Sequence, residues 1–179
     1  LPLHVAALFG HGSVAAALCE GGFPPNEVVQ RPGEQGSRLV VNAHSSIARA
    51  HLTRDSEVEG ALEGHTALHI AARFGYTRVA SSMLDRSADI NRPCLSTGYA
   101  FSDGASSLHL AACSGHLGVA QLLCHASART DMYTDGGLSP LGGAASNGYA
   151  GIAAVLLAMS ADPRGLPMKG PTPLHAAVG

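Results

Sequence analysis

Apolar and polar residues recur along the chain in a fixed order that predicts pairs of short helices. Five tetrapeptides follow or approach the pattern Thr/Ser-x-Leu-His, and an Ala-Ala pair stands three and four residues after each Leu. In four copies, a Gly comes seven residues after the Leu, a β-branched residue eleven after it, and Leu or Met fifteen after it. Apolar residues at such spacing share one helix face. Each unit therefore predicts a short helix, a tight turn, a second helix and a polar loop.

The predicted helices begin and end at residues typical of caps. Thr66 and Ser106 stand three residues before their His, where a side-chain hydroxyl accepts a backbone N–H. Gly75 and Gly115 follow the first helix of their units, and Gly suits a left-handed cap. Polar breaks such as residues 87–91 end the second helix. A unit of this size cannot bury its apolar face alone, so the units are expected to stack.

The spacing of the repeated Leu locates two irregular stretches. From Leu3 through Leu68, Leu108 and Leu141 to Leu174, successive spacings are 65, 40, 33 and 33 residues. The seven residues above 33 in the second spacing fall within residues 92–103 and predict an enlarged loop. The first spacing is almost two periods, so residues 27–63 are either a long insertion or a degenerate repeat. Both interpretations stay open.

The sequence Thr172-Pro-Leu-His-Ala-Ala177 resembles the signature of the ankyrin repeat, Thr-Pro-Leu-His-x-Ala at a period of 33. The resemblance implies an all-α solenoid of helix-turn-helix units with short β-hairpin finger loops. The expected units are a repeat at 1–26, the insertion or degenerate repeat at 27–63, a repeat with an enlarged finger at 64–103, repeats at 104–136 and 137–169, and a truncated repeat at 170–179.

Composition and charge exclude several classes of partner. The chain is 46% hydrophobic and 13% charged, with a net charge of −2 and a single Lys, so it offers no stripe of cations for nucleic acid. The longest apolar run, residues 152–159, is far shorter than the roughly 20 residues that cross a bilayer. We therefore expect a monomer that binds neither nucleic acid nor membrane. Four scattered Cys suggest reduced thiols and an intracellular, cytoplasmic location. Because the chain starts at Leu1, not Met, its natural ends look missing and targeting signals cannot be read.

The residues that could carry chemistry are better explained by the repeat. Six of the ten His recur at fixed repeat positions, which favours a structural role. Cys113, His116, Cys124 and His125 resemble a zinc constellation, but their repeat positions place them on different helices. The glycines of residues 143–148 have the spacing of a phosphate loop, yet Tyr149 stands where Lys is required. We expect no catalytic residue, no metal and no cofactor, and therefore no enzyme.

The resemblance implies binding of an unidentified partner protein through a concave face and the finger loops. Its contact positions follow the Ala-Ala pairs and occupy the fingers; here they are Phe9, Arg73, Phe74, Cys113, Ser114, Ser146 and Asn147, with Tyr99, Phe101, Met132 and Tyr133 on the fingers. An alternative is that Phe9 and Phe74 pack against the insertion or a finger. The function expected from this is a protein-protein interaction module. The second hypothesis is a docking region of a larger enzyme, such as an acyltransferase, kinase or ubiquitin-ligase subunit, or of a channel.

Overall fold

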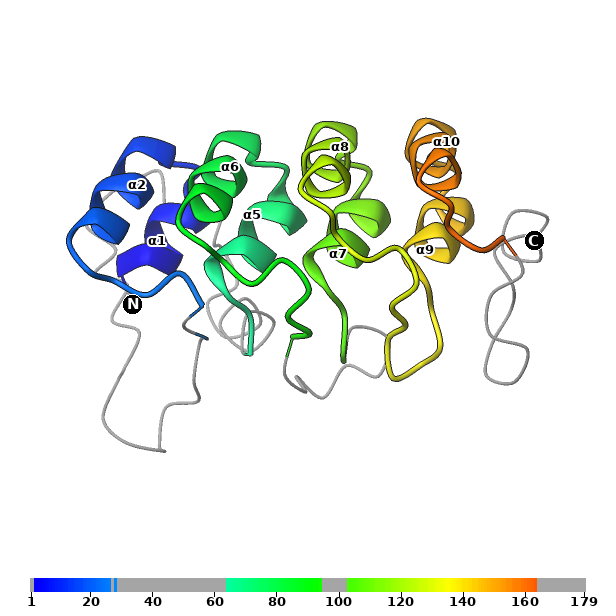
Figure 1. Ribbon diagram of the computed structural model, residues 1–179, viewed down its shortest axis with the longest axis horizontal. Helices are drawn as coiled ribbons and strands as arrows, with labels where there is room; N and C mark the ends of the chain where they lie inside the picture. The colour runs from blue at the N-terminus through cyan, green and yellow to red at the C-terminus, as the bar shows by residue number, and fades with distance from the viewer. Residues whose placement is uncertain (1, 27, 29–63, 95–102, 164–179) are drawn as a thin grey trace, which may run out of the picture.

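Helices in two parallel rows form the described part of the chain. The computed structural model describes residues 2–26, 28, 64–94 and 103–163. Within these residues the helices are α1 (Pro2–Leu8), α2 (Gly12–Glu20), α5 (Ala67–Phe74), α6 (Thr77–Asp85), α7 (Ser107–Ser114), α8 (Leu117–His125), α9 (Pro140–Ser146) and α10 (Ala150–Ala158). Figure 1 shows α1, α5, α7 and α9 in one row and α2, α6, α8 and α10 in the other. The all-α solenoid predicted from the repeat is confirmed.

The first described helix pair packs directly on the second, although residues 27–63 separate the two pairs in the sequence. Helix α1 contacts α5, and α2 contacts α6. Arg86 forms an ion pair with Glu20, and the backbone N–H of Asp89 donates to Oδ1 of Asn26 at 2.7 Å. These two pairs are therefore direct neighbours in the stack. The segment read as an insertion or degenerate repeat lies outside the described residues except for Val28, as does the truncated repeat at 170–179.

Two of the motif histidines, His69 and His109, tie their units to the loop that follows. Nδ1 of His69 accepts from the backbone N–H of Thr66 at 3.1 Å, so its Nε2–H donates to the carbonyl oxygen of Arg92 at 3.0 Å. His109 repeats this arrangement with the N–H of Ser106 and the carbonyl of Leu138. The structural role predicted for these two imidazoles is confirmed. Burial is the main cause that lowers the pKa of His69 to about 3 and that of His109 to about 4.

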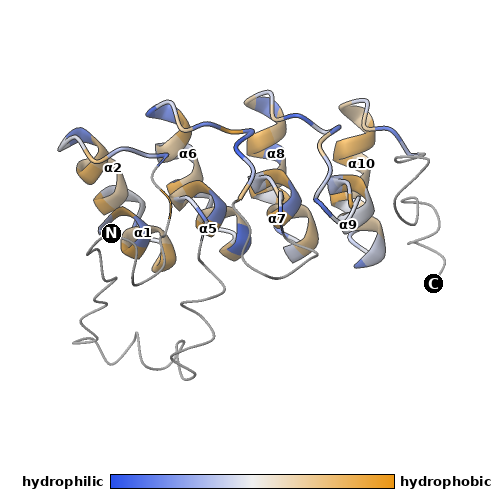
Figure 2. Ribbon diagram, turned by 90° about the horizontal axis from the view of Figure 1, so that it is seen from below, coloured by the Kyte–Doolittle hydropathy of each residue, from blue (hydrophilic) through white to orange (hydrophobic). Residues whose placement is uncertain are grey.

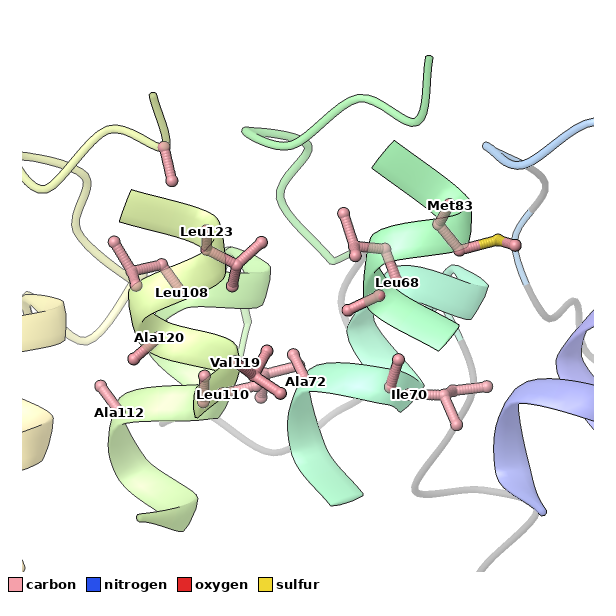
Figure 3. Close-up of a cluster of buried hydrophobic side chains, with 14 of the residues drawn as sticks. Leu68, Ile70, Ala72, Met83, Leu108, Leu110, Ala112, Val119, Ala120 and Leu123 are labelled. Atoms are coloured by element: carbon pink, nitrogen blue, oxygen red, sulfur yellow. The ribbon is translucent and has the colours of Figure 1, made fainter. Parts of the chain in front are cut away.

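Small and β-branched residues allow neighbouring repeats to approach closely. The second Ala of the pair is fully buried in the units of α5 and α7, at Ala72 and Ala112. Figure 3 shows Ala72 meeting Leu110 and Val119 of the next repeat. The predicted β-branched position is buried at Val79, Val119 and Ile152, whereas its equivalent Val14 is 49% exposed. Val119 packs on Ala72 of the preceding unit (Figure 3), and no described residue precedes α1 to cover Val14 in the same way.

The described parts of the finger loops are paired but contain no β-strand. The N–H of Cys94 donates to the carbonyl of Ala105 at 2.8 Å, and the N–H of Thr134 donates to the carbonyl of Leu138 at 3.0 Å. The N–H of Gly104 also donates to the carbonyl of Cys94 at 3.3 Å, and the N–H of Asp135 donates to the carbonyl of Asp103 at 2.9 Å, which joins the two loops. These bonds close turns and link the loops without forming a ladder. The β-hairpins expected from the resemblance are therefore absent from residues 128–138 and from the described ends of 92–103.

Three serines in the loops after the second helices have a left-handed backbone. The φ angles of Ser87, Ser127 and Ser160 are 62°, 66° and 63°, and Gly22 holds the equivalent position with a φ of 90°. A side chain in this region costs roughly 1–2 kcal/mol, which the lost chain entropy of a Gly offsets in part. We expect Ser127→Gly to raise the free energy of unfolding by about 0.5–1 kcal/mol in urea denaturation. The reverse change, Gly22→Ser, should lower it; equal stability of all three proteins would contradict this expectation.

Candidate functional site

The turns between the two helices of each repeat lie along one edge of the array, here called the turn edge. It comprises residues 8–14, 73–78, 113–118 and 146–151. Each segment contains the end of a first helix, a Gly with a positive φ angle and the start of a second helix. Gly75 and Gly115 are left-handed caps, with φ angles of 78° and 80°, as predicted from their position.

In the second and later described repeats, the residue that follows the turn Gly packs on the turn Gly of the preceding repeat. The ring of Tyr76 lies over Gly10, that of His116 over Gly75 and that of Tyr149 over Gly115. A Cβ at Gly75 would lie 2.6 Å from Nδ1 of His116, so only Gly leaves room for the ring. Nε2 of His116 also donates to the carbonyl oxygen of Arg73 at 2.9 Å. Each repeat therefore fixes the turn of the one before it.

Four rings of the first two described repeats form a continuous surface, here called the aromatic patch: Phe9, His11, Phe74 and Tyr76. Phe9 stacks on His11 and Phe74 stacks on Tyr76, each with ring centroids 6.2 Å apart. Tyr76 joins the two pairs because it lies over Gly10, the residue between Phe9 and His11. Phe74 is 39% exposed and His11 is exposed, while Phe9 and Tyr76 are half-buried.

The structure places the predicted contact residues in different environments. Arg73 and Phe74 are exposed at the turn edge, and Phe9 and Ser114 are half-buried there. Met132 and Tyr133 are half-buried on the loop before α9. Tyr99 and Phe101 lie outside the described residues, so their contribution stays a prediction. The suggested packing of Phe74 on a finger finds no support among the described residues, where its ring contact is with Tyr76.

In three of the predicted contact residues, the polar or thiol group contacts other residues of the array. Sγ of Cys113 faces Gly143 of the next repeat so closely that a Cβ there would overlap it, and burial raises the pKa of this thiol. Nδ2 of Asn147 donates to the carbonyl of Gly143 at 2.8 Å, and Oγ of Ser146 donates to the same carbonyl at 3.1 Å. The two polar groups bond within their own repeat and the thiol packs on the next one, so the accessible chemistry of the turn edge lies mainly in the first two described repeats.

Sequence reasoning missed His11, Tyr76 and Arg78 as members of the site. His11 was assigned to the scaffold because His or Tyr recurs after each turn Gly. That same recurrence was the available signal, since a ring at every turn predicts a row of rings along one edge. Arg78 gave no signal in the repeat pattern, because the equivalent position is Gly118 in the next repeat and Gly151 in the one after it.

The described residues contain neither a cluster of metal-ligating side chains nor a membrane-spanning helix. No three His, Cys, Asp or Glu side chains among them converge on a point where a metal ion could bind. Cys113 and Cys124, which resembled zinc ligands in the sequence, form no disulfide among the described residues, and neither do Cys19 and Cys94. No described helix has the length and apolar character needed to cross a membrane.

Comparison with known proteins gives the family. A family model described as ankyrin repeats (3 copies) matches residues 1–134 and 108–179. The mouse (Mus musculus) protein fem-1 homolog A-like is 35% identical over 96 residues, which are 52% of this chain and 13% of the mouse protein. The chain thus aligns with only a small part of that relative's length. Together with the stacked helix pairs, the match over the whole sequence shows that the chain belongs to the ankyrin repeat family.

Proposed function

We propose that this array binds a partner protein through the turn edge of its first two described repeats and the concave face beside it. Ankyrin repeats are protein-protein interaction modules, and the observation that supports this location is the aromatic patch with its exposed Phe74. Aromatic residues and Arg dominate the energetics of protein interfaces. Arg73, exposed and adjacent to Phe74, supplies the second kind of anchor.

The rigidity of the patch favours recognition. Phe74 is stacked on Tyr76, Tyr76 is seated on Gly10, and the carbonyl of Arg73 is held by His116. Side chains that are already ordered before binding lose less conformational entropy when the partner arrives. A partner residue that covers Phe74 would therefore gain apolar contact at a low entropic cost.

We expect Phe74→Ala and Arg73→Ala each to weaken partner binding at least about ten-fold, as truncation of an interface anchor does. Both side chains are exposed, so the free energy of unfolding should change by less than about 1 kcal/mol. The partner can be isolated by photo-crosslinking from benzoylphenylalanine placed at position 74, and its affinity for each variant measured by isothermal titration calorimetry.

Met159→Ala is the matched control, because Met159 is 42% exposed but follows α10 at the other end of the described array. It should leave both affinity and stability unchanged. A loss of several kcal/mol of stability in Phe74→Ala, without a loss of affinity, would mean that Phe74 is a core residue.

We further propose that the array acts as a monomer inside the cell, without a cofactor. Its four cysteines form no disulfide among the described residues, which supports a reducing compartment, and two of them, Cys94 and Cys124, are buried. Light scattering of the purified chain should give the mass of one copy, 18.1 kDa; a larger mass would exclude the monomer.

A further inference from the structure

The charges of the described residues are separated between the two edges of the array. All seven of the described Asp and Glu residues lie at the ends of the second helices or in the loops that lead from them to the next repeat, on the edge opposite the turns. Glu20 and Asp85, for example, are the last residues of α2 and α6. Three of the five described Arg also lie on that loop edge, which gives its described residues an excess of four negative charges. Figure 2 shows the loops that leave α6 and α8 mostly in the hydrophilic colour.

The turn edge has the opposite character. The four segments that form it contain Arg73 and Arg78 but no Asp or Glu. Arg73 is near the end of α5 and Arg78 near the start of α6, so both flank the turn that carries Phe74 and Tyr76. The ion pairs of the described residues engage Arg86 and Arg129 on the loop edge, and neither Arg73 nor Arg78 takes part in them. Two guanidinium groups that form no ion pair with another described residue thus lie beside the aromatic patch.

Distance keeps the two edges electrostatically distinct. A helix of nine residues, such as α6, is about 13 Å long, whereas screening in physiological salt acts over about 8 Å. The carboxylates of the loop edge therefore do little to neutralise Arg73 and Arg78. A negatively charged partner segment is attracted to the turn edge and repelled from the loop edge.

We infer that the partner segment bound at the turn edge is an acidic peptide that carries an aromatic or aliphatic anchor; this rests on the function proposed above. The anchor would pack on Phe74 within the aromatic patch, and carboxylates on either side of it would pair with Arg73 and Arg78. Guanidinium groups hold carboxylates in bidentate pairs, and this geometry makes the contact specific in orientation as well as favourable in energy. The charge separation also sets the position of the segment, because the loop edge excludes it.

The test is a selection from a library of random twelve-residue peptides displayed on phage, against the immobilised full chain. We expect the selected pool to be enriched in Asp and Glu around an aromatic or aliphatic residue. For a synthetic peptide from this pool, the double variant Arg73→Glu/Arg78→Glu should weaken binding at least ten-fold, measured by fluorescence anisotropy. A selection on that variant should instead enrich Lys and Arg.

Arg129→Glu is the matched control, since it makes the same charge change at an exposed residue of the loop edge. It should leave the selected pool and the affinity unchanged. A pool without acidic enrichment whose binding still requires Phe74 would overturn the acidic specificity and leave the proposed function standing. If no peptide is enriched above background, both the acidic specificity and the proposed function would be overturned for peptide ligands. Tighter Arg73- and Arg78-dependent binding of an oligonucleotide or of phosphatidylserine vesicles would overturn the inference in favour of a phosphate ligand.

Discussion

Lowering the pH from 7.5 to 5 is expected to cost this protein about 4 kcal/mol of folding stability through two buried histidines. Burial lowers the pKa of His69 to about 3, with nearby His65 as the next cause, and lowers that of His109 to about 4. Both imidazoles are neutral in the fold, where Nδ1 accepts from the backbone and Nε2–H donates to a carbonyl oxygen. A second proton would break the bond at Nδ1.

The sign of the effect follows from which state binds protons first. In the unfolded chain these imidazoles titrate near 6.5, so the unfolded state gains protons below that pH while the folded state does not. The stabilising contribution is fully present above about pH 6.5 and is lost as the pH falls toward the folded pKa values. At pH 5 the loss is about 2 kcal/mol for each His, a large part of the 5–15 kcal/mol typical of a folded domain.

Urea denaturation followed by circular dichroism at pH 7.5, 6 and 5 measures this loss. The control is His109→Asn, which removes one titrating group. This variant should be less stable at pH 7.5 but should lose only about half as much stability on acidification. The same pH slope in the variant and the wild type would show that His109 is not the group responsible.

The local signals in the sequence were sufficient to predict the helix pairs and the packing of the histidines. Thr66 and Ser106 cap their helices, Gly75 and Gly115 end them, and the β-branched positions from the second described repeat onward are buried. Each of these features depends on contacts within one repeat or on a contact that every repeat makes with the next. The recurrence of these residues in the sequence is therefore enough to predict the caps and the buried positions.

Features that depend on one particular pair of repeats could not be predicted in this way. Val14 has the residue type of a buried position but is exposed, because burial there depends on the preceding unit. The fingers, expected to form hairpins, make too few backbone pairs for a strand within the described residues. The seating of Tyr76 over Gly10 recurs in the later repeats, but the aromatic patch also needs Phe9 and Phe74, whose equivalents in the next two repeats are Ser114 and Asn147.

The environment of Cys113 at the candidate site also depends on one particular pair of repeats. Its position after the Ala-Ala pair predicted a surface residue, but its environment is set by the second residue after the repeated Leu in the next unit. That residue is Ile70 in one repeat and Leu110 in another, and it is Gly143 in the repeat next to Cys113. The missing side chain leaves a space that the thiol fills. Two departures from the repeat pattern, a Cys and a Gly, thus compensate each other across an interface.

This compensation predicts a strong coupling between the two positions. A Cβ at Gly143 would meet Sγ of Cys113 well inside van der Waals contact, so Gly143→Ala should lower the free energy of unfolding by about 1–2 kcal/mol. Cys113→Ala alone should lower it by about 1 kcal/mol, since the space beside Gly143 would be left empty. In the double variant the new methyl group occupies the place of the thiol, and α9 gains about 1 kcal/mol of helix propensity from the replaced Gly.

The double variant Cys113→Ala/Gly143→Ala is therefore expected to be at least as stable as the wild type, although each single change is destabilising. Urea denaturation of the four proteins gives the coupling free energy, which we expect to be about 2–3 kcal/mol in favour of the double variant. Cys124→Ala combined with Gly143→Ala is the control, because Cys124 is a buried thiol that lies on α8, away from Gly143. Its two effects should add. Additive effects for Cys113 and Gly143 as well would mean that the thiol rotates away at little cost and that the two residues do not hold each other in place.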